Sequence, residues 1–148
     1  MIRQHTPFVT VIVTVGKKYA TEAFLGRALA SLILQTYPKD RFEVLVVADG
    51  VQCEGLARTH ADALVIRYHE CPESRGVGFA SQEGLRLARG EFFARVDADD
   101  SVLPDWLSTL TKALCEARAD KTVAYAYGGL VIVDDVTLHE EPKKLTPE

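Results

Sequence analysis

A run of eight residues near the N-terminus, Phe8 to Val15, is apolar or β-branched at almost every position and stops at Gly16. A half-buried strand would alternate apolar and polar residues, so a continuous run of this kind indicates a strand that is covered on both faces. Comparable runs recur at Phe42–Val47, Ala63–Tyr68 and Glu91–Val96. Such strands restrict the chain to folds in which helices pack on both faces of a mainly parallel sheet.

Helical segments fill the intervals between these strands. An apolar stripe predicts a helix from Glu22 to Gln35, which the Tyr37-Pro38 step ends. A second stripe predicts a helix over Val77–Ala88, with Gly90 as the helix-ending residue. Pro104 can open a further helix, in which Asp105 lies favourably in the first turn. Weaker patterns predict a short helix within residues 51–62, a loop at 69–76 and two last strands at 122–127 and 130–133.

The alternation of strands and helices predicts an α/β fold with a Rossmann-type, mainly parallel sheet. A chain of 148 residues, 47% of them hydrophobic, has the size and composition of one globular domain, which we assign to residues 1–138. The segment from His139 to Glu148 is polar, contains two prolines and is predicted to be disordered.

Composition excludes several classes of function. No apolar run approaches the ~20 residues that cross a bilayer, and the N-terminus lacks the apolar stretch of a secretory signal, so we expect a cytoplasmic protein without a membrane span. A net charge of −4 makes nucleic acid an unsuitable partner. The odd number of cysteines, without a C-x-x-C pair, predicts free thiols at Cys53, Cys71 and Cys115.

Polar groups follow three of the predicted strands: Thr14 with Gly16, Asp49 with Gly50, and Asp97 with Asp99 and Asp100. A parallel sheet would bring these strand ends to one edge, where open α/β sheets bind their ligands. Clustered carboxylates are hard oxygen ligands that suit Mg²⁺ or Mn²⁺. The alternative is a helix cap and turn, in which Asp and Ser are common. The position directly after an apolar strand favours the metal site.

Several segments together resemble glycosyltransferase family 2, a group of inverting, nucleotide-sugar-dependent transferases with the GT-A fold. The segment "LGRALASLILQTYP" (25–38) is similar to the family's "L..SLL.QTY" helix, and "FEVLVVADG" (42–50) to "EIIVVDDGS". The segment "RGVGFASQEGLRLARGEFFARVDADD" (75–100) is similar to "G.A.ARN.G...A.GEYI.FLDADD", and "LPDWL" (103–107) also fits. These segments lie in the family's order over about residues 8 to 115. The resemblance therefore implies a GT-A fold and a nucleotide-sugar donor.

The resemblance implies roles for individual residues. Thr14 and Val15 lie where the first strand of the family meets the nucleotide, and Asp49 matches an aspartate that contacts the base. Arg75 lies near a position where a basic residue helps to hold the nucleotide.

Asp97, Ala98 and Asp99 match the family's D-x-D element, which contacts the ribose of the donor and, through Mn²⁺ or Mg²⁺, its diphosphate. Asp100 completes this loop as a third candidate metal ligand. The cation would stabilise the charge of the departing diphosphate while a carboxylate deprotonates the acceptor hydroxyl.

The chain departs from the family pattern at several positions. Gly16-Lys17 replaces an aromatic-Asn pair, Ala48 replaces the first aspartate of "DDGS", and Val51 replaces its serine. The "ARN" triplet reads Ala80-Ser81-Gln82, so its arginine is missing. Two interpretations of Arg75 stay open: it compensates for this arginine, or it is a solvated loop residue.

Family catalytic domains continue beyond the D-x-D element into a segment that binds the acceptor and carries the catalytic base. Here about 48 residues follow Asp100, so we expect a domain truncated in its acceptor-binding part. Asp134 and Asp135 are interpreted as a strand-terminating turn, and the catalytic residues are unknown.

Two functions stay open. The first is a glycosyltransferase domain that binds a nucleoside diphosphate sugar, with UDP as the expected nucleotide, and transfers the sugar to an unknown glycan, lipid or protein acceptor. The alternative is a degenerate, non-catalytic nucleotide-sugar-binding or assembly subunit. A nucleotidyltransferase of related fold would need a glycine-rich phosphate loop, which Gly16-Lys17-Lys18 matches poorly. An incomplete sheet edge would favour pairing with a second copy, so we also expect a homodimer.

Overall fold

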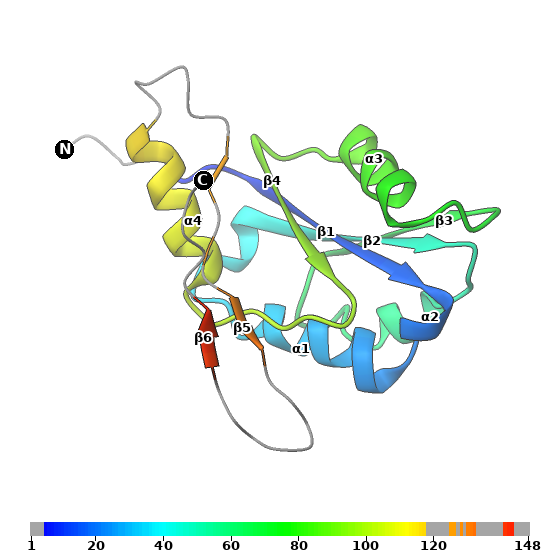
Figure 1. Ribbon diagram of the computed structural model, residues 1–148. Helices are drawn as coiled ribbons and strands as arrows, with labels where there is room; N and C mark the ends of the chain where they lie inside the picture. The colour runs from blue at the N-terminus through cyan, green and yellow to red at the C-terminus, as the bar shows by residue number, and fades with distance from the viewer. Residues whose placement is uncertain (1–4, 118–124, 127, 129, 133–140, 144–148) are drawn as a thin grey trace.

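The computed structural model describes residues 5–117, 125, 126, 128, 130–132 and 141–143, and these form an α/β fold around a four-stranded sheet. The strands are β1 (Val9–Gly16), β2 (Phe42–Asp49), β3 (Ile66–Cys71) and β4 (Phe92–Asp97). Their order is β3-β2-β1-β4, and every neighbouring pair is parallel (Figure 1). The predicted mainly parallel sheet is confirmed.

Helices cover both faces of this sheet. A π-helical turn (Glu22–Gly26) leads into α1 (Arg27–Ile33), which lies with α2 (Glu54–Arg58) on one face. On the opposite face lies α3 (Val77–Leu87), as Figure 1 shows. The helix α4 (Trp106–Glu116) follows the loop after β4.

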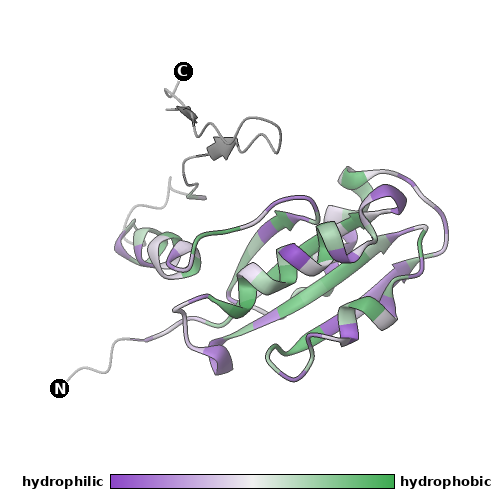
Figure 2. Ribbon diagram, turned by 90° about the horizontal axis from the view of Figure 1, so that it is seen from below, coloured by the Kyte–Doolittle hydropathy of each residue, from purple (hydrophilic) through white to green (hydrophobic). Residues whose placement is uncertain are grey.

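The apolar character of β1 follows from this arrangement, because successive side chains of a strand point to opposite faces. Val9, Val11, Val13 and Val15 belong to the larger core layer, with Leu25, Leu29 and Leu32 from the segment that contains α1. Ile12 belongs to the second layer, with Leu45 and Val47 of β2 and Ala80 of α3. Figure 2 shows apolar residues along the strands and on the helices that cover them.

The third strand differs from the sequence prediction. We expected it at Ala63–Tyr68, whereas β3 begins at Ile66 and continues to Cys71. Residues 63 and 64 instead belong to a turn, in which the backbone N–H groups of Ala63 and Leu64 both donate to the carbonyl of His60. Leu64 is buried in this turn, so its apolar character reflects packing rather than strand pairing. The predicted loop accordingly begins three residues later than expected.

The start of α4 also differs, because the chain reaches helical conformation at Trp106 rather than at Pro104. The carbonyl of Pro104 accepts the backbone N–H of Thr36 at 2.7 Å, and the carbonyl of Leu103 accepts the Gln35 side-chain amide at 2.7 Å. Gln35 also accepts the backbone N–H of Leu107 through its side-chain oxygen at 3.0 Å. The end of one predicted helix therefore anchors the beginning of the next.

Near the C-terminus, β5 (Leu130–Ile132) pairs with β6 (Glu141–Lys143) in antiparallel orientation. The predicted strand at 130–133 is thus present over its first three residues. Most of the predicted strand at 122–127 lies outside the described residues, and Tyr125 and Ala126 are not in a strand. The segment predicted to be disordered contains β6, and the rest of it lies outside the described residues.

Candidate functional site

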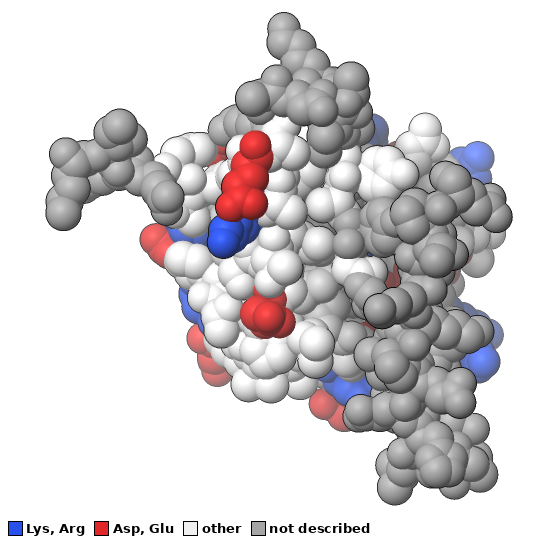
Figure 3. Space-filling model, turned by 60° about the vertical axis from the view of Figure 1, so that its left-hand side comes forward, with Lys and Arg blue, Asp and Glu red and all other residues white. Residues whose placement is uncertain are grey.

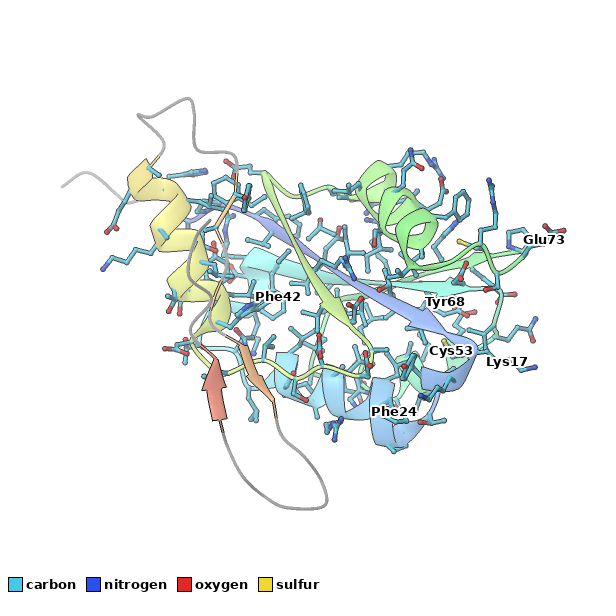
Figure 4. All side chains as sticks on the ribbon, in the orientation of Figure 1. Lys17, Phe24, Phe42, Cys53, Tyr68 and Glu73 are labelled. Atoms are coloured by element: carbon cyan, nitrogen blue, oxygen red, sulfur yellow. The ribbon has the colours of Figure 1, made fainter. Side chains whose placement is uncertain are left out.

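The carboxyl ends of the strands converge as the sequence predicts. In the parallel register, Thr14 of β1 lies opposite Asp97 of β4, and Gly16 of β1 lies opposite Asp49 of β2. Figure 4 shows Lys17, Cys53 and Tyr68 toward this end of the sheet, whereas Phe42 marks the start of β2. Thr14, Asp49 and Asp97 therefore share one edge, although they come from three separate strands.

Asp97 is held by two neighbours on the outer side of this edge. The hydroxyl of Thr14 donates to Oδ1 of Asp97 at 2.7 Å. The Arg95 guanidinium reaches the same carboxylate, with Nη2 at 2.7 Å from both Oδ1 and Oδ2. Arg95 and Asp97 are two residues apart on β4, so their side chains lie on the same face of the strand. Hydrogen bonds between charged groups are stronger than neutral ones, and Asp97 is therefore a firmly oriented carboxylate.

Asp99 and Asp100 follow in the turn after β4 and are exposed. Partial removal from water, and then the negative charges of Asp99 and Asp97, raise the pKa of the Asp100 carboxyl. Arg27 of α1 donates to the backbone carbonyl of Asp99 at 3.3 Å. Several carboxylates thus lie close together in this turn, and a bound cation would reduce the repulsion between them. Within the described part of the chain, however, no three His, Cys, Asp or Glu side chains are arranged to hold a metal ion.

Asp49 is buried at the end of β2 and binds the loop that follows β3. Its Oδ2 accepts the Ser74 hydroxyl at 2.8 Å and the Gly76 N–H at 2.9 Å, while Oδ1 accepts the Arg75 N–H at 2.8 Å. Burial would raise the pKa of Asp49, but these three hydrogen bonds outweigh it and lower that pKa. Asp49 therefore fixes the 74–76 segment, and its predicted contact with a nucleotide base stays a prediction.

Replacing Asp49 by asparagine is expected to destabilise the fold by about 1.5–3 kcal/mol at pH 7, since hydrogen bonds to a charged group are lost. Because the folded-state pKa of Asp49 is lowered, its stabilisation is fully present above the unfolded-state pKa of about 3.9 and is lost as the pH falls from there through the lower folded-state pKa. Urea unfolding of both proteins between pH 7 and pH 3 measures this difference. A gap that stays constant down to pH 3 would contradict an ionised role for Asp49.

The 74–76 segment in turn places Arg75. The guanidinium carbon of Arg75 lies 4.0 Å from the centre of the Phe79 ring, in the first turn of α3. Gly50 follows Asp49 with a φ of 66°, and a Cβ atom there would lie 2.3 Å from the backbone nitrogen of Ser74. The close approach of these two loops explains why a glycine ends the second strand. Among the described residues no hydrogen bond or ion pair joins Arg75 to Asp97. The edge therefore has two separate clusters of polar residues, one around Asp49 and the other around Asp97.

Four predicted site residues are buried, namely Thr14 and Asp49 with polar side chains and Val15 and Ala98 in the apolar core. Val15 and Ala98 are each 1% exposed, and the backbone N–H of Ala98 donates to the carbonyl of Thr14 at 3.2 Å. Their predicted contact with a nucleotide sugar stays a prediction. A hollow of about 470 Å³ lies nearby on the α2 side, lined by Ala20, residues 52–56 and Glu70. None of the predicted site residues lines this hollow.

Sequence reasoning missed Arg95, Ser74 and Arg27 as parts of this edge. Arg95 carried a usable signal, because a charged residue interrupts an otherwise apolar strand two positions before Asp97. Ser74 and Arg27 carried none, since they belong to a loop and a helix whose distance from the acidic turn depends on the fold.

The parallel sheet, with helices on both faces and a polar carboxyl edge, has the arrangement of a GT-A fold. The sequence model of "Glycosyl transferase family 2" matches residues 10–144, and the chain belongs to this family. It is 33% identical to glycosyltransferase GlyA of Streptococcus pneumoniae over 125 residues, which cover 80% of this chain and 17% of GlyA.

Solved structures agree with this assignment. The mannosyltransferase PcManGT of Pyrobaculum calidifontis, in complex with GDP-Man and Mn²⁺, has a TM-score of 0.69 and 31% identity, covering 81% of this chain and 34% of that one. S. aureus TarS 1-349, in complex with UDP, has a TM-score of 0.67 and 28% identity, covering 75% and 33%. The chain spans between 17% and 41% of the length of the curated relatives that it matches.

In the described ranges, none of the helices combines the length and the apolar character that crossing a membrane would require. All three cysteines are free, as the sequence predicts. The cytoplasmic location stays a prediction. Asp134 and Asp135 lie outside the described residues.

Proposed function

We propose that this chain is the donor-binding domain of an inverting glycosyltransferase, which binds a nucleoside diphosphate sugar at the carboxyl edge of its sheet. The observation that carries the proposal is the oriented Asp97 carboxylate, bonded to Thr14 at 2.7 Å, directly beside the exposed Asp99 and Asp100. Family membership over residues 10–144 makes a sugar donor the fitting ligand. The related structures with UDP and GDP-Man support a nucleotide sugar, with UDP as our first choice of nucleotide.

The acidic turn fits Mg²⁺ or Mn²⁺ in one particular way. Magnesium-type ions take one or two protein carboxylates and complete their shell with water and substrate phosphates. Asp99 and Asp100 are exposed and can supply such carboxylates, and the two residues are adjacent in the turn after β4. In the proposed cation site, the protein therefore supplies one or two carboxylates, and the diphosphate of the donor supplies further oxygen ligands.

A bound cation of this kind supplies charge neutralisation to the departing nucleoside diphosphate. The chain's own residues bind and orient the donor. Asp97 presents a fixed carboxylate to the hydroxyl groups of the ribose, and Thr14 holds it in place. Asp49 fixes the loop that carries Arg75, whose guanidinium is available to the nucleotide from the other side of the edge.

Calorimetric titration of UDP and GDP, with and without Mn²⁺, tests the proposal. We expect Mn²⁺-dependent binding of one nucleotide, and a loss of at least about tenfold in affinity, about 1.4 kcal/mol, in Asp99→Asn. Asp62→Asn is the matched control, because Asp62 is an exposed aspartate in the turn before β3. Absence of binding for UDP, GDP and dTDP would reject the donor site.

The non-catalytic alternative assigns the chain the same donor-binding site as the catalytic proposal. The two differ only in whether the chain transfers the sugar. Sugar transfer from the bound donor to any acceptor by this chain would reject it. Donor binding with hydrolysis and transfer both absent, across glycan and lipid acceptors, would favour a nucleotide-sugar-binding or assembly subunit.

We further propose a homodimer that pairs through β4. In the described sheet β4 is an outer strand, and its Phe93 is 57% exposed, whereas β1 and β2 are buried along almost their whole length. An outer strand of a sheet can pair with a strand of another chain. Light scattering at high concentration is expected to give twice the mass of 16.3 kDa, and Phe93→Lys to give the single mass. A monomeric mass for the unaltered protein would end this proposal.

A further inference from the structure

Arg95 occupies an unusual place for a cation, inside the acidic edge that the proposed function assigns to a metal-bound donor. Its Nη2 lies 2.7 Å from both oxygens of Asp97, and its Nε lies 3.2 Å from Oδ1. The Thr14 hydroxyl occupies a further position on Oδ1. Asp97 therefore accepts hydrogen bonds from the protein itself on both oxygens.

The pair lies at the surface and is not a buried structural ion pair. The side chains of Arg95 and Asp97 are 45% and 37% exposed. On the face drawn in Figure 3, acidic and basic groups lie dispersed among larger uncharged areas. Exposed ion pairs contribute little to stability, so stability does not explain why the carboxylate has this partner.

We infer that the Arg95 guanidinium acts as a counter-ion that prevents Asp97 from serving as a metal ligand. Arg95 thereby lowers the affinity of this edge for a divalent cation when no nucleotide is bound. A divalent cation that bound to Oδ2 of Asp97 would lie next to the Arg95 guanidinium. Two positive charges that close repel each other. Asp99 and Asp100 are then the two carboxylates left for the cation, which the donor's diphosphate must complete. The cation accordingly binds with the nucleotide and not ahead of it.

This inference rests on the proposed function for the identity of the ligand, but its test contains no nucleotide. Mn²⁺ is titrated into the protein at low ionic strength, and free Mn²⁺ is followed by electron paramagnetic resonance. Arg95→Gln is expected to bind Mn²⁺ about three- to tenfold more tightly than the unaltered protein, because a positive charge next to the site is removed. Arg95→Lys, which keeps the charge, is expected to bind like the unaltered protein.

Two controls separate the inference from general charge effects. Arg86→Gln breaks another arginine–carboxylate pair, in which Nη2 lies 2.7 Å from Glu83 on α3, and is expected to leave Mn²⁺ binding unchanged. The double variant Arg95→Gln with Asp97→Asn is expected to lose the gain, because the carboxylate that Arg95 blocks is gone. If Arg95→Gln fails to fold, Arg95→Leu is used instead, because it also removes the positive charge from the outer strand β4.

Mn²⁺ affinity of Arg95→Gln equal to or weaker than that of the unaltered protein, including undetectable binding in both, would overturn the inference. A gain of the same size in Arg86→Gln, or one that survives Asp97→Asn, would overturn it as well. Failure of the proposed function is a different result, namely no binding of UDP, GDP or dTDP at any Mn²⁺ concentration.

Discussion

Replacing Arg67 by methionine is expected to destabilise the fold by about 3 kcal/mol, the lower end of the cost of breaking a buried ion pair. Arg67 of β3 donates to Oε1 of Glu43 on β2 at 2.9 Å, and the Glu43 side chain is only 4% exposed. Without the guanidinium, a buried carboxylate loses its positive partner. The Arg67 side chain is 24% exposed, which lets water relieve part of the loss and places the effect at that lower end.

Urea unfolding followed by circular dichroism measures this effect. Arg86→Met is the matched control, since its pair with Glu83 lies on the surface of α3 and is expected to shift the midpoint little. Combining Arg67→Met with Glu43→Leu is expected to recover much of the loss, because the buried charge is then removed as well. If the single variant unfolds at the same urea concentration as the unaltered protein, Glu43 does not depend on Arg67.

Replacing Gly90 by alanine is expected to cost about 3 kcal/mol through overpacking. A Cβ atom at Gly90 would lie 2.3 Å from the carbonyl oxygen of Phe92 and 2.5 Å from the backbone nitrogen of Thr10. Both contacts are to backbone atoms of the sheet, which cannot turn aside as a flexible side chain can. The Gly90 N–H also donates to the Thr10 hydroxyl at 2.9 Å, so a displaced residue would break this bond too.

Thermal and urea unfolding compare this variant with Gly55→Ala. Gly55 lies in α2, where an added Cβ meets nothing within 4 Å, and alanine there is expected to stabilise the helix by about 0.5–1 kcal/mol. The two substitutions add the same methyl group, so opposite signs isolate the effect of space. Equal stability of the two variants would contradict the close approach at Gly90.

The sequence prediction for Gly90 was right about its importance and wrong about its cause. We expected a residue that ends a helix, but α3 already ends at Leu87, and the described glycines with positive φ are Gly50 and Gly76. Gly90 is a glycine because β1 and the start of β4 pass too close for a side chain. Two segments about 80 residues apart create this restriction, and no local pattern contains it.

The same distinction separates the two halves of the candidate site. Thr14 and Asp97 could be placed at one edge from the sequence, because an apolar strand has a direction and a parallel sheet aligns the ends of its strands. The pairing of Arg95 with Asp97 could also have been inferred, since residues two apart on a strand share a face. The partners of Asp49 could not, because they belong to a loop whose path depends on where β3 lies.

The limits of β3 illustrate the reason. The run from Ala63 to Tyr68 is apolar enough for a strand, but Leu64 is buried by a turn and strand pairing begins at Ile66. Side-chain periodicity and strand direction are properties of a short segment, so the amino-acid sequence specified the α/β class, the covered strands and the acidic edge. Which atoms meet across that edge depends on strand order, register and loop path. The tertiary structure alone therefore decided that Asp49 holds a loop, that Arg67 neutralises Glu43 and that Gly90 admits no side chain.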